Sequence, residues 1–346
     1  MPPRLLLVLL TLSLSGCDLG STPEPARFEG EAMGTTWAVV VADPVSESER
    51  LIVERAVADE LASVNAQMSN YLEDSELSRF NRLPAQTPFR VSSATFEVFR
   101  EAMRVSELTG GAFDVTVGPL VRRWGFGPGS PASRSPPGPE ELESLRAVVG
   151  YRKVVLDDDA QTIEKTVPGI ECDLSAIAKG YSVDRVAAAL DERGYRNYMV
   201  EVGGEVRTQG KNAASEAWRI AIESPIASVR AIHRVIPVSG LSIATSGDYR
   251  NFYELEGEIY SHLIDPRTEK PVGHSLASVS VVDESCMRAD ALASGLLVLG
   301  PEEGYRLATE EDLAVLFLVR GPDDGIEERA TPAFEQLFFD VSKLGS

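Results

Sequence analysis

Three groups of residues in this sequence are suited to chemistry. The first lies in the stretch 170–181, Ile-Glu-Cys-Asp-Leu-Ser-Ala-Ile-Ala-Lys-Gly-Tyr. The pattern predicts a strand over 170–174, a corner of small residues, and a helix with Lys179 in its first turn. A cation there is disfavoured by about 0.3–1 kcal/mol, because the helix dipole is positive at that end. Free helix amides, a lysine and small neighbouring side chains together suit a phosphate. The alternative is a solvated lysine on an ordinary strand-to-helix turn.

A second group of oxygen donors lies at Asp290 and Ser294, on another predicted helix. Residues i and i+4 leave the same face of a helix, so this carboxylate and this hydroxyl are neighbours. Hard oxygen donors of this kind suit Mg²⁺ that is bound together with phosphates. An aspartate near a helix start is also compatible with plain capping.

The third candidate is His262, one of only three histidines in the chain. It shares a strand face with Tyr260 and Ile264, just before a turn. Its function is either that of a general base or phosphate contact, or that of a structural histidine. The sequence contains no Ser-His-Asp order, zinc-ligand spacing, Walker loop or GxGxxG fingerprint.

The elements that must position these residues do not alternate strictly between strand and helix. We therefore expect an α+β fold with a mixed, largely antiparallel sheet and flanking helices. Helices are expected at 47–70, 92–108, 139–149, 177–194, 287–299 and 302–309. Strands are expected at 35–41, 153–156, 162–165, 170–174, 197–202, 219–223, 233–238, 242–245, 249–255, 258–264, 275–282, 314–320 and near the C-terminus. The stretch 118–139, rich in glycine, proline and serine, is expected to be an ordered loop.

The composition narrows the choice of partners. The chain has 346 residues, a net charge of −20 and a pI of about 4.6, and no basic run occurs in it. Such a chain is not built to bind nucleic acid or an anionic membrane surface. An anionic ligand would need local neutralisation by a metal, a lysine or helix N-termini.

The N-terminus is predicted to be a targeting segment. Residues 1–17 have a short positive start, an apolar run too brief to span a bilayer, and the sequence Leu14-Ser-Gly-Cys17. This pattern is typical of a bacterial lipoprotein signal peptide that ends at a lipidated Cys17, with a plain secretory signal as the alternative. Residues 18–27 are expected to be a tether, and 28–346 one domain. Asp18 resembles the signal that retains lipoproteins at the cell inner membrane, so we expect a lipid anchor on the periplasmic side.

Cys172 and Cys286 are the cysteines that remain. The expected compartment permits disulfides, so a disulfide between them is one reading. Two buried free thiols are the reading that the sequence favours.

Eight motifs, in chain order, resemble one family, the ApbE proteins or FAD:protein FMN transferases. The resemblance covers nearly the whole chain from about Phe28, and it implies that family's α+β fold. The motifs are Met33-Gly-Thr-Thr, Met68-Ser-Asn-Tyr71 with Ser75-Glu-Leu-Ser, Thr109-Gly-Gly-Ala-Phe-Asp114-Val, Asp173-Leu-Ser-Ala-Ile-Ala-Lys179-Gly-Tyr, Val202-Gly-Gly-Glu205, Ser246-Gly-Asp-Tyr-Arg-Asn, Ser261-His-Leu-Ile-Asp-Pro-Arg267-Thr and Ala289-Asp290-Ala-Leu-Ala.

The resemblance implies an enzyme that uses Mg²⁺ to transfer FMN from FAD to a threonine of an acceptor flavoprotein subunit, forming a phosphoester and releasing AMP. It implies that Mg²⁺ is held by Asp290, Ser294 and the carbonyl of Ala176, with Ala293 as a further ligand. The implied FAD contacts are Met33, Tyr71, Ala112, Phe113, Asp114, Asp173, Lys179 and Ile264. His262 would activate the acceptor hydroxyl, while Lys179 and the metal at Asp290 would neutralise growing phosphate charge.

Two other functions remain open on this sequence. One is a Mg²⁺-dependent FAD pyrophosphatase with water as acceptor, and the other is an FAD-binding lipoprotein without catalysis. Three positions depart from the family pattern. Ser294 stands in place of the usual threonine, and Glu269 stands in place of a glycine, a change that bears on its turn. Arg122 and Arg123 stand where uncharged residues are usual and are candidates for contact with the acceptor.

Overall fold

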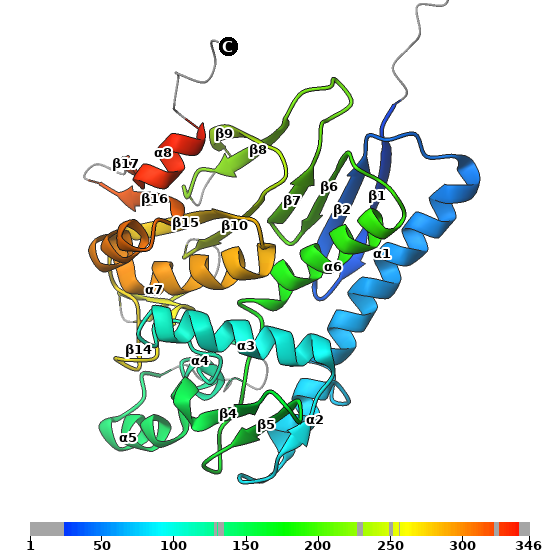
Figure 1. Ribbon diagram of the computed structural model, residues 1–346. Helices are drawn as coiled ribbons and strands as arrows, with labels where there is room; N and C mark the ends of the chain where they lie inside the picture. Colours follow the sequence, from blue (N-terminus) through cyan, green and yellow to red (C-terminus); the bar gives the residue numbers. More distant parts are fainter. Residues whose placement is uncertain are drawn as a thin grey trace, which may run out of the picture.

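A computed structural model describes residues 24–127, 130, 135–226, 231–248, 252–255, 257–321 and 325–338. Its centre is an eight-stranded sheet, antiparallel between all neighbours, in the order β1-β2-β6-β7-β10-β15-β16-β17 (Figure 1). The expected α+β class is therefore confirmed. The strands are β1 (Ala26–Ala32), β2 (Thr35–Val41), β6 (Tyr198–Val202), β7 (Glu205–Gln209), β10 (Ser242–Gly247), β15 (Leu276–Asp283), β16 (Ala314–Arg320) and β17 (Ile326–Ala330).

Both faces of this sheet are covered. On one face lie α1 (Glu47–Met68), α6 (Ala178–Glu192) and α7 (Cys286–Glu310), with α3 (Ser93–Leu108) packed on α7 (Figure 1). The other face packs on β8 (Trp218–Glu223), β9 (Ile232–Val238) and α8 (Pro332–Phe338). Because both faces are covered, β15 is almost continuously buried, including Ser278 and Ser280, which alternate with valines along it.

The α7 helix breaks near its middle, where Gly300 has φ 84° and ψ −177° and Pro301 follows. Proline cannot donate to the helical ladder and glycine adopts such a backbone without strain. The two helices expected at 287–299 and 302–309 are thus the two halves of α7, and the prediction is confirmed.

Smaller elements form the lower part of the molecule in Figure 1. Two strands, β4 and β5, make a small sheet with β3, flanked by α2 and, toward the other side, by α4 and α5. These elements are α2 (Glu76–Arg82), β3 (Phe89–Arg90), α4 (Gly118–Arg123), α5 (Pro139–Val148), a 3-10 turn (Tyr151–Lys153), β4 (Val154–Asp157), β5 (Thr162–Lys165), β11 (Phe252–Leu255), β12 (Glu258–Ser261), β13 (Ile264–Asp265) and β14 (Lys270–Pro271).

The strand expected at 170–174 is wrong. The segment belongs to no strand or helix. Its backbone groups are held instead by a side chain and by a loop: the Asn81 amide bonds the N–H and the carbonyl of Cys172 at 2.8 Å each, and Asp173 N–H donates to Val115 O at 2.6 Å. Side-chain partners 91 residues away leave no trace in the local pattern.

Other boundaries differ from expectation as well. The β1 strand begins at Ala26, inside the stretch expected to be tether, and α4 forms within the stretch expected to be loop. The signal segment and Cys17 lie outside the described residues. In the part of the chain that the structure covers, none of the helices has the length and apolarity needed to cross a membrane. Cys172 and Cys286 are buried free thiols, as the sequence favoured.

Candidate functional site

The N-terminus of α6 carries Lys179, which is not a solvated surface lysine. Its Nζ donates to Glu205 Oε1 at 2.5 Å and lies 3.7 Å from Asp290 Oδ1. Glu205 and Asp290 are each only 2% exposed. These carboxylates explain why a cation is held where the helix dipole disfavours it, and they raise the pKa of Lys179 against the opposing effect of burial.

Glu205 is the site residue that the sequence reasoning left without a role. It is the first residue of β7, directly after the turn in which Gly203 and Gly204 have φ 60° and 102°. Burial raises its pKa to about 8; the Lys179 cation opposes that rise and the Asp290 charge adds to it. Its second oxygen, Oε2, is buried and has no hydrogen-bond partner among the described residues. The available signal was the motif Val202-Gly-Gly-Glu205, an acid at the start of a strand after a glycine turn.

Asp290 connects α7 to the start of α6. Its Oδ2 accepts the Gly180 N–H at 2.9 Å, so this helix amide, expected to be open to a phosphate, already has a carboxylate partner. The capping of α7 belongs to Ser285, whose Oγ accepts the Arg288 N–H at 3.2 Å, so Asp290 does not cap its own helix. The two helices are in close contact because residue 180 is glycine: a Cβ there would lie 2.2 Å from Cys286 O.

Ser294 lies one turn after Asp290, and its Oγ is 3.0 Å from Ser246 Oγ of β10. Ala293 beside it is buried, and Ala176 is half-buried in the turn before α6. Within the residues described, no group of three or more His, Cys, Asp or Glu side chains is placed to hold a metal. A metal here would therefore depend on a carboxylate, a hydroxyl and carbonyls.

This donor set fits a divalent cation. Asp290 and Glu205 bring two buried carboxyl groups to one lysine, so the cluster has more oxygen donors than Lys179 alone engages. The unpartnered Glu205 Oε2 adds a further unsatisfied acceptor. Mg²⁺ takes oxygen ligands of these types and commonly shares them with phosphates.

Two of the predicted ligand contacts, Met33 on the first hairpin and Phe113 on the 109–114 loop, lie near Lys179 or against the helix that carries Asp290. Met33 has φ 53° at the tip of the β1–β2 hairpin, next to Thr35. A Cβ at Gly203 would lie 2.9 Å from Thr35 Cγ2 and 3.1 Å from Lys179 Cδ, so this tip adjoins the lysine. Phe113 packs on α7 in the same way, because a Cβ at Gly295 would lie 3.1 Å from Phe113 Cβ.

Ala112 and Asp114 complete that loop. Ala112 is 2% exposed, so any ligand contact would go through its backbone or a small surface. The Asp114 carboxylate accepts the N–H and hydroxyl of Thr116 at 2.8 and 2.6 Å and the Tyr151 N–H at 2.7 Å. Burial still raises its pKa, with these hydrogen bonds opposing the rise. Asp114 therefore shapes the loop, and its contact with a ligand stays a prediction.

Asp173 lines a cavity next to the α6 N-terminus. The other lining residues are Asn70, Asn81, Gly118, Val121, Arg122, Phe126, Gly127, Glu171 and Cys172. Tyr71 follows Asn70 and is 75% exposed, which leaves its ring available to stack on a ligand. Arg122 donates to Glu171 at 2.5 Å and Arg123 to Glu141 at 2.6 Å, so both arginines have partners within the chain.

His262 lies against the far wall of that cavity. Its ring meets Phe126 edge-on, with centroids 6.2 Å apart, and Phe126 is a lining residue. Ile264, at the start of β13, is buried in the same aromatic cluster, and β13 packs on α7. The structure thus brings Lys179 and Asp290 together at one end of the site, and Asp173, Ile264 and His262 around the cavity at the other.

The turn after β13 contains the departure at Glu269. This residue has φ 65°, a backbone that favours glycine, and its carboxylate accepts two hydrogen bonds from Arg146 of α5, at 2.5 and 3.0 Å. Its carbonyl accepts the Trp124 indole N–H at 2.8 Å. The side chain thereby keeps the strained turn in place and ties it to α5.

Comparison with known proteins identifies one family. The model of the ApbE family matches residues 33–317. The FAD:protein FMN transferase of Vibrio cholerae serotype O1 is 43% identical over 324 residues, which cover 94% of this chain and 95% of that protein. The protein of that name from Haemophilus influenzae is 40% identical over 95% of this chain and 96% of its own. The solved flavin transferase ApbE from Vibrio cholerae superposes with a TM-score of 0.82 at 41% identity, covering 91% of this chain and 99% of that one.

Proposed function

The chain belongs to the ApbE family, and on this premise we propose that it transfers FMN from FAD to a threonine hydroxyl of an acceptor protein and releases AMP. Relatives named FAD:protein FMN transferase align along nearly their whole length. The observation that carries the proposal is the buried cluster of Lys179, Glu205 and Asp290 at the start of α6. A protein that only stored FAD would have no use for such a costly group of buried charges.

The reaction balances as a single phosphoryl transfer. The threonine oxygen forms a bond to the FMN phosphorus, and the bond from that phosphorus to the bridging pyrophosphate oxygen breaks. AMP leaves with the bridging oxygen, and the threonine proton passes to an imidazole nitrogen of His262. The packing of His262 against Phe126, which lines the cavity, supports its role as the base.

The charged end of the site would bind the pyrophosphate. Mg²⁺, held by Asp290 and Ser294 with the carbonyls of Ala176 and Ala293 as further ligands, would polarise the phosphoryl oxygens. Lys179 contributes a cation that Glu205 and Asp290 orient before the substrate arrives. A preorganised charge of this kind stabilises the developing negative charge without reorganisation.

FAD would lie between the two ends of the site. Met33 adjoins the charged cluster, and Phe113 packs on α7 from the loop that also carries Ala112 and Asp114. Asp173 lines the cavity, Tyr71 follows the lining residue Asn70, and Ile264 is packed in the cluster that contains Phe126. Tyr71 and Met33 offer polarisable surfaces for ring contacts.

The proposed acceptors are flavoprotein subunits at the inner membrane, met on the periplasmic side. Lipidation at Cys17 would tether the domain near them, as the pattern Leu14-Ser-Gly-Cys17 supports. Changing Cys17→Ser should move the protein from the membrane fraction to the aqueous fraction of cells. A variant that stays in the membrane fraction would contradict the anchor.

The proposed activity is tested with purified protein, FAD, Mg²⁺ and a candidate acceptor domain. We expect a fluorescent acceptor band on a denaturing gel, lost when its target threonine is changed to alanine. FMN and AMP in solution without a band would identify a pyrophosphatase, and neither product would leave only FAD binding.

A further inference from the structure

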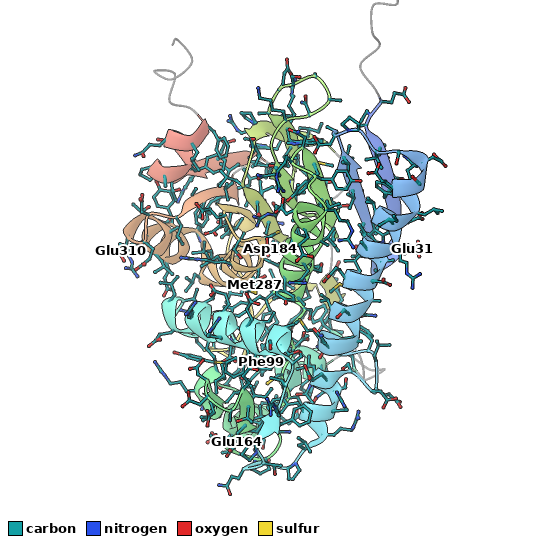
Figure 2. All side chains as sticks on the ribbon, turned by 45° about the vertical axis from the view of Figure 1, so that its right-hand side comes forward. Glu31, Phe99, Glu164, Asp184, Met287 and Glu310 are labelled. Carbon is teal, nitrogen blue, oxygen red and sulfur yellow. The ribbon has the colours of Figure 1, made fainter. Side chains whose placement is uncertain are left out.

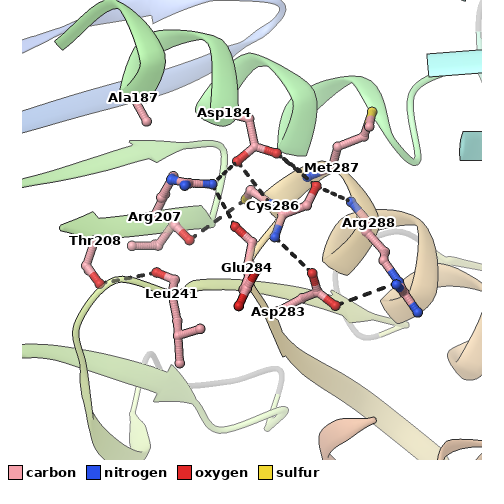
Figure 3. A network of polar contacts seen from close by, with 12 residues as sticks. Asp184, Ala187, Arg207, Thr208, Leu241, Asp283, Glu284, Cys286, Met287 and Arg288 are labelled. Atoms are coloured by element: carbon pink, nitrogen blue, oxygen red, sulfur yellow. Dashed lines mark hydrogen bonds and ion pairs between the residues drawn. The ribbon is translucent and has the colours of Figure 1, made fainter. Parts of the chain in front are cut away.

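Asp184 lies on α6 one turn after Gly180, on the same face of the helix, and its carboxylate extends to the start of α7. Its Oδ1 accepts the Cys286 N–H at 3.1 Å, and its Oδ2 accepts the Met287 N–H at 3.0 Å and the Ser285 hydroxyl at 3.1 Å (Figure 3). Asp184 and Met287 lie next to each other where the two helices meet (Figure 2). The α7 helix thus has a second N-terminal cap, supplied by another helix.

This second cap does more than stabilise α7. The first amides of a helix lack partners within it, and one side chain at the N-cap commonly satisfies one of them. Ser285 already does so for α7. The additional bonds from Asp184 fix where α7 begins relative to α6.

Arg207 joins the β7 strand to the same carboxylate. Its Nη1 donates to Asp184 Oδ1 at 2.7 Å and to the Glu284 carbonyl at 2.7 Å (Figure 3). Alternate residues of a strand project to the same side, so Arg207 and Glu205 both face α6. Two ion pairs therefore connect β7 to α6: Glu205 with Lys179, and Arg207 with Asp184.

The three elements joined by Asp184 are the elements that carry the charged cluster. Lys179 is on α6, Asp290 on α7 and Glu205 on β7. Met287 and Asp290 are three residues apart, about 4.5 Å along the helix axis. A shift of α7 along α6 would therefore change the 3.7 Å between Lys179 Nζ and Asp290 Oδ1 and the 2.9 Å between Gly180 N and Asp290 Oδ2.

We propose that Asp184 and Arg207 are positioning residues that set the spacing of Lys179 and Asp290, and thereby the affinity of this site for a divalent cation and for the pyrophosphate. The inference rests on the proposed function for the identity of those ligands. Neither residue is proposed to touch the reacting atoms. Asp184 and Arg207 bond to each other and to the chain at the start of α7, and they act through the position of that helix.

The test compares Asp184→Asn with Arg185→Gln. An asparagine side chain has one oxygen acceptor where aspartate has two. One of two pairs of donors therefore loses its acceptor: Arg207 and the Cys286 N–H, which share Oδ1, or the Ser285 hydroxyl and the Met287 N–H, which share Oδ2. Arg185, the next residue, pairs with Glu60 of α1 at 3.1 Å and has its contact on a different helix, which makes it the matched control for lost stability. Arg207→Gln is the second variant, because it removes one ion pair and leaves the caps of α7.

The readouts are Mg²⁺ titration by calorimetry in the presence of FAD, the Mg²⁺ concentration for half-maximal FMN transfer, and Tm. We expect Asp184→Asn to weaken Mg²⁺ binding about tenfold, within the range seen when residues behind a metal ligand are changed, and Arg207→Gln to weaken it several-fold. Arg185→Gln should lower Tm and leave the Mg²⁺ affinity at the wild-type value.

Wild-type Mg²⁺ affinity in both Arg207→Gln and any folded Asp184→Asn protein would overturn the proposal. So would an equal loss in Arg185→Gln, because the effect would then follow stability alone. If the wild type binds Mg²⁺ and FAD but transfers no FMN, the proposed function fails, while the calorimetric comparison still decides the role of Asp184 and Arg207.

Discussion

Two parts of the site are built in different ways. The charged junction consists of Lys179 on α6, Glu205 on β7 and Asp290 on α7. The aromatic wall consists of the rings of Trp124, Phe126, Tyr253 and Tyr260, with His262 packed against Phe126. The junction places its charges on long helices and a central strand, where each side chain is oriented by a backbone ladder and by ion pairs such as Lys179–Glu205. The wall stacks rings from short segments: the centroid of the Tyr260 ring lies 5.7 Å from that of Trp124 and 5.2 Å from that of Tyr253.

This difference indicates that the charged side chains must be held rigidly, while the aromatic rings need not be. Phosphate chemistry gains from charges fixed before the substrate arrives, because reorienting them would add to the barrier. Ring recognition depends on area and tolerates adjustment of the segments that supply it. We therefore expect substitutions at the junction to abolish FMN transfer, and substitutions at the wall to slow one step of the reaction or weaken one contact with FAD.

The largest effect is expected from Asp290→Ala. The change removes the carboxylate that holds the Gly180 amide and faces Lys179, so FMN transfer should fall below detection while the fold persists. Transfer and Tm should be measured together, with Asp283→Ala as control, since the Asp283 carboxylate accepts the N–H of Ser285, just before α7, at 2.9 Å. Full activity with only a lowered Tm would make Asp290 a structural residue and would contradict the expectation that the junction carries the chemistry.

His262→Ala tests the wall. If His262 accepts the threonine proton, FAD binding should stay near the wild-type value while transfer slows by about 10²–10⁴-fold, the usual size of a general-base effect. The matched control is His233→Ala, because His233 lies on β9, across the sheet, and is bonded to Glu328 at 2.8 Å. Loss of FAD binding together with the rate would indicate a supporting role, and an unchanged rate would remove His262 from the mechanism.

Lys179→Met should weaken FAD binding by about tenfold, the equivalent of one charge-assisted contact, and leave riboflavin binding unaffected. It should also lower stability by about 3 kcal/mol, because two buried carboxylates lose their cation. The double variant Lys179→Met/Glu205→Gln should recover much of that stability but not the FAD affinity. An equal loss for FAD and for riboflavin would show that the lysine does not contact phosphate.

The smallest effect is a pH dependence of stability carried by Glu205. Its pKa is raised from 4.5 to about 8, chiefly by burial, so the folded protein binds this proton more tightly than the unfolded chain. The stability that this proton contributes is fully present below about pH 4.5 and is lost as the pH rises through about 8. Tm should therefore fall more steeply from pH 5 to 8 in the wild type than in Glu205→Gln. Parallel curves would mean that Glu205 is ionised throughout.

Much of the junction could be predicted from local patterns. The 3.6-residue periodicity located α6 and both halves of α7, and the i, i+4 spacing placed Asp290 and Ser294 on one face. The position of Lys179 against the helix dipole correctly marked it as unusual. These features are carried by a few consecutive residues, which is why sequence reasoning finds them.

What could not be predicted depends on partners far along the chain. Glu205 meets Lys179 only because the β6–β7 hairpin brings a strand across the start of α6. The segment at 170–174 is held by Asn81. The strained Glu269 is held by Arg146, 123 residues away. Asp184 likewise caps a helix that begins 102 residues later, at the Cys286 N–H. Tertiary contacts of this kind override local propensity and leave no local signal.

The central claim is that the charged junction and the wall act together on one phosphoryl transfer to a protein. The most direct measurement follows AMP release and covalent flavin on the acceptor in the same reaction, with FAD, Mg²⁺ and the acceptor domain. We expect AMP and flavinylated acceptor to accumulate in equal amounts, and no AMP to appear when the acceptor is omitted. AMP released at the same rate with and without acceptor would contradict it, because water would then be the substrate that the site activates.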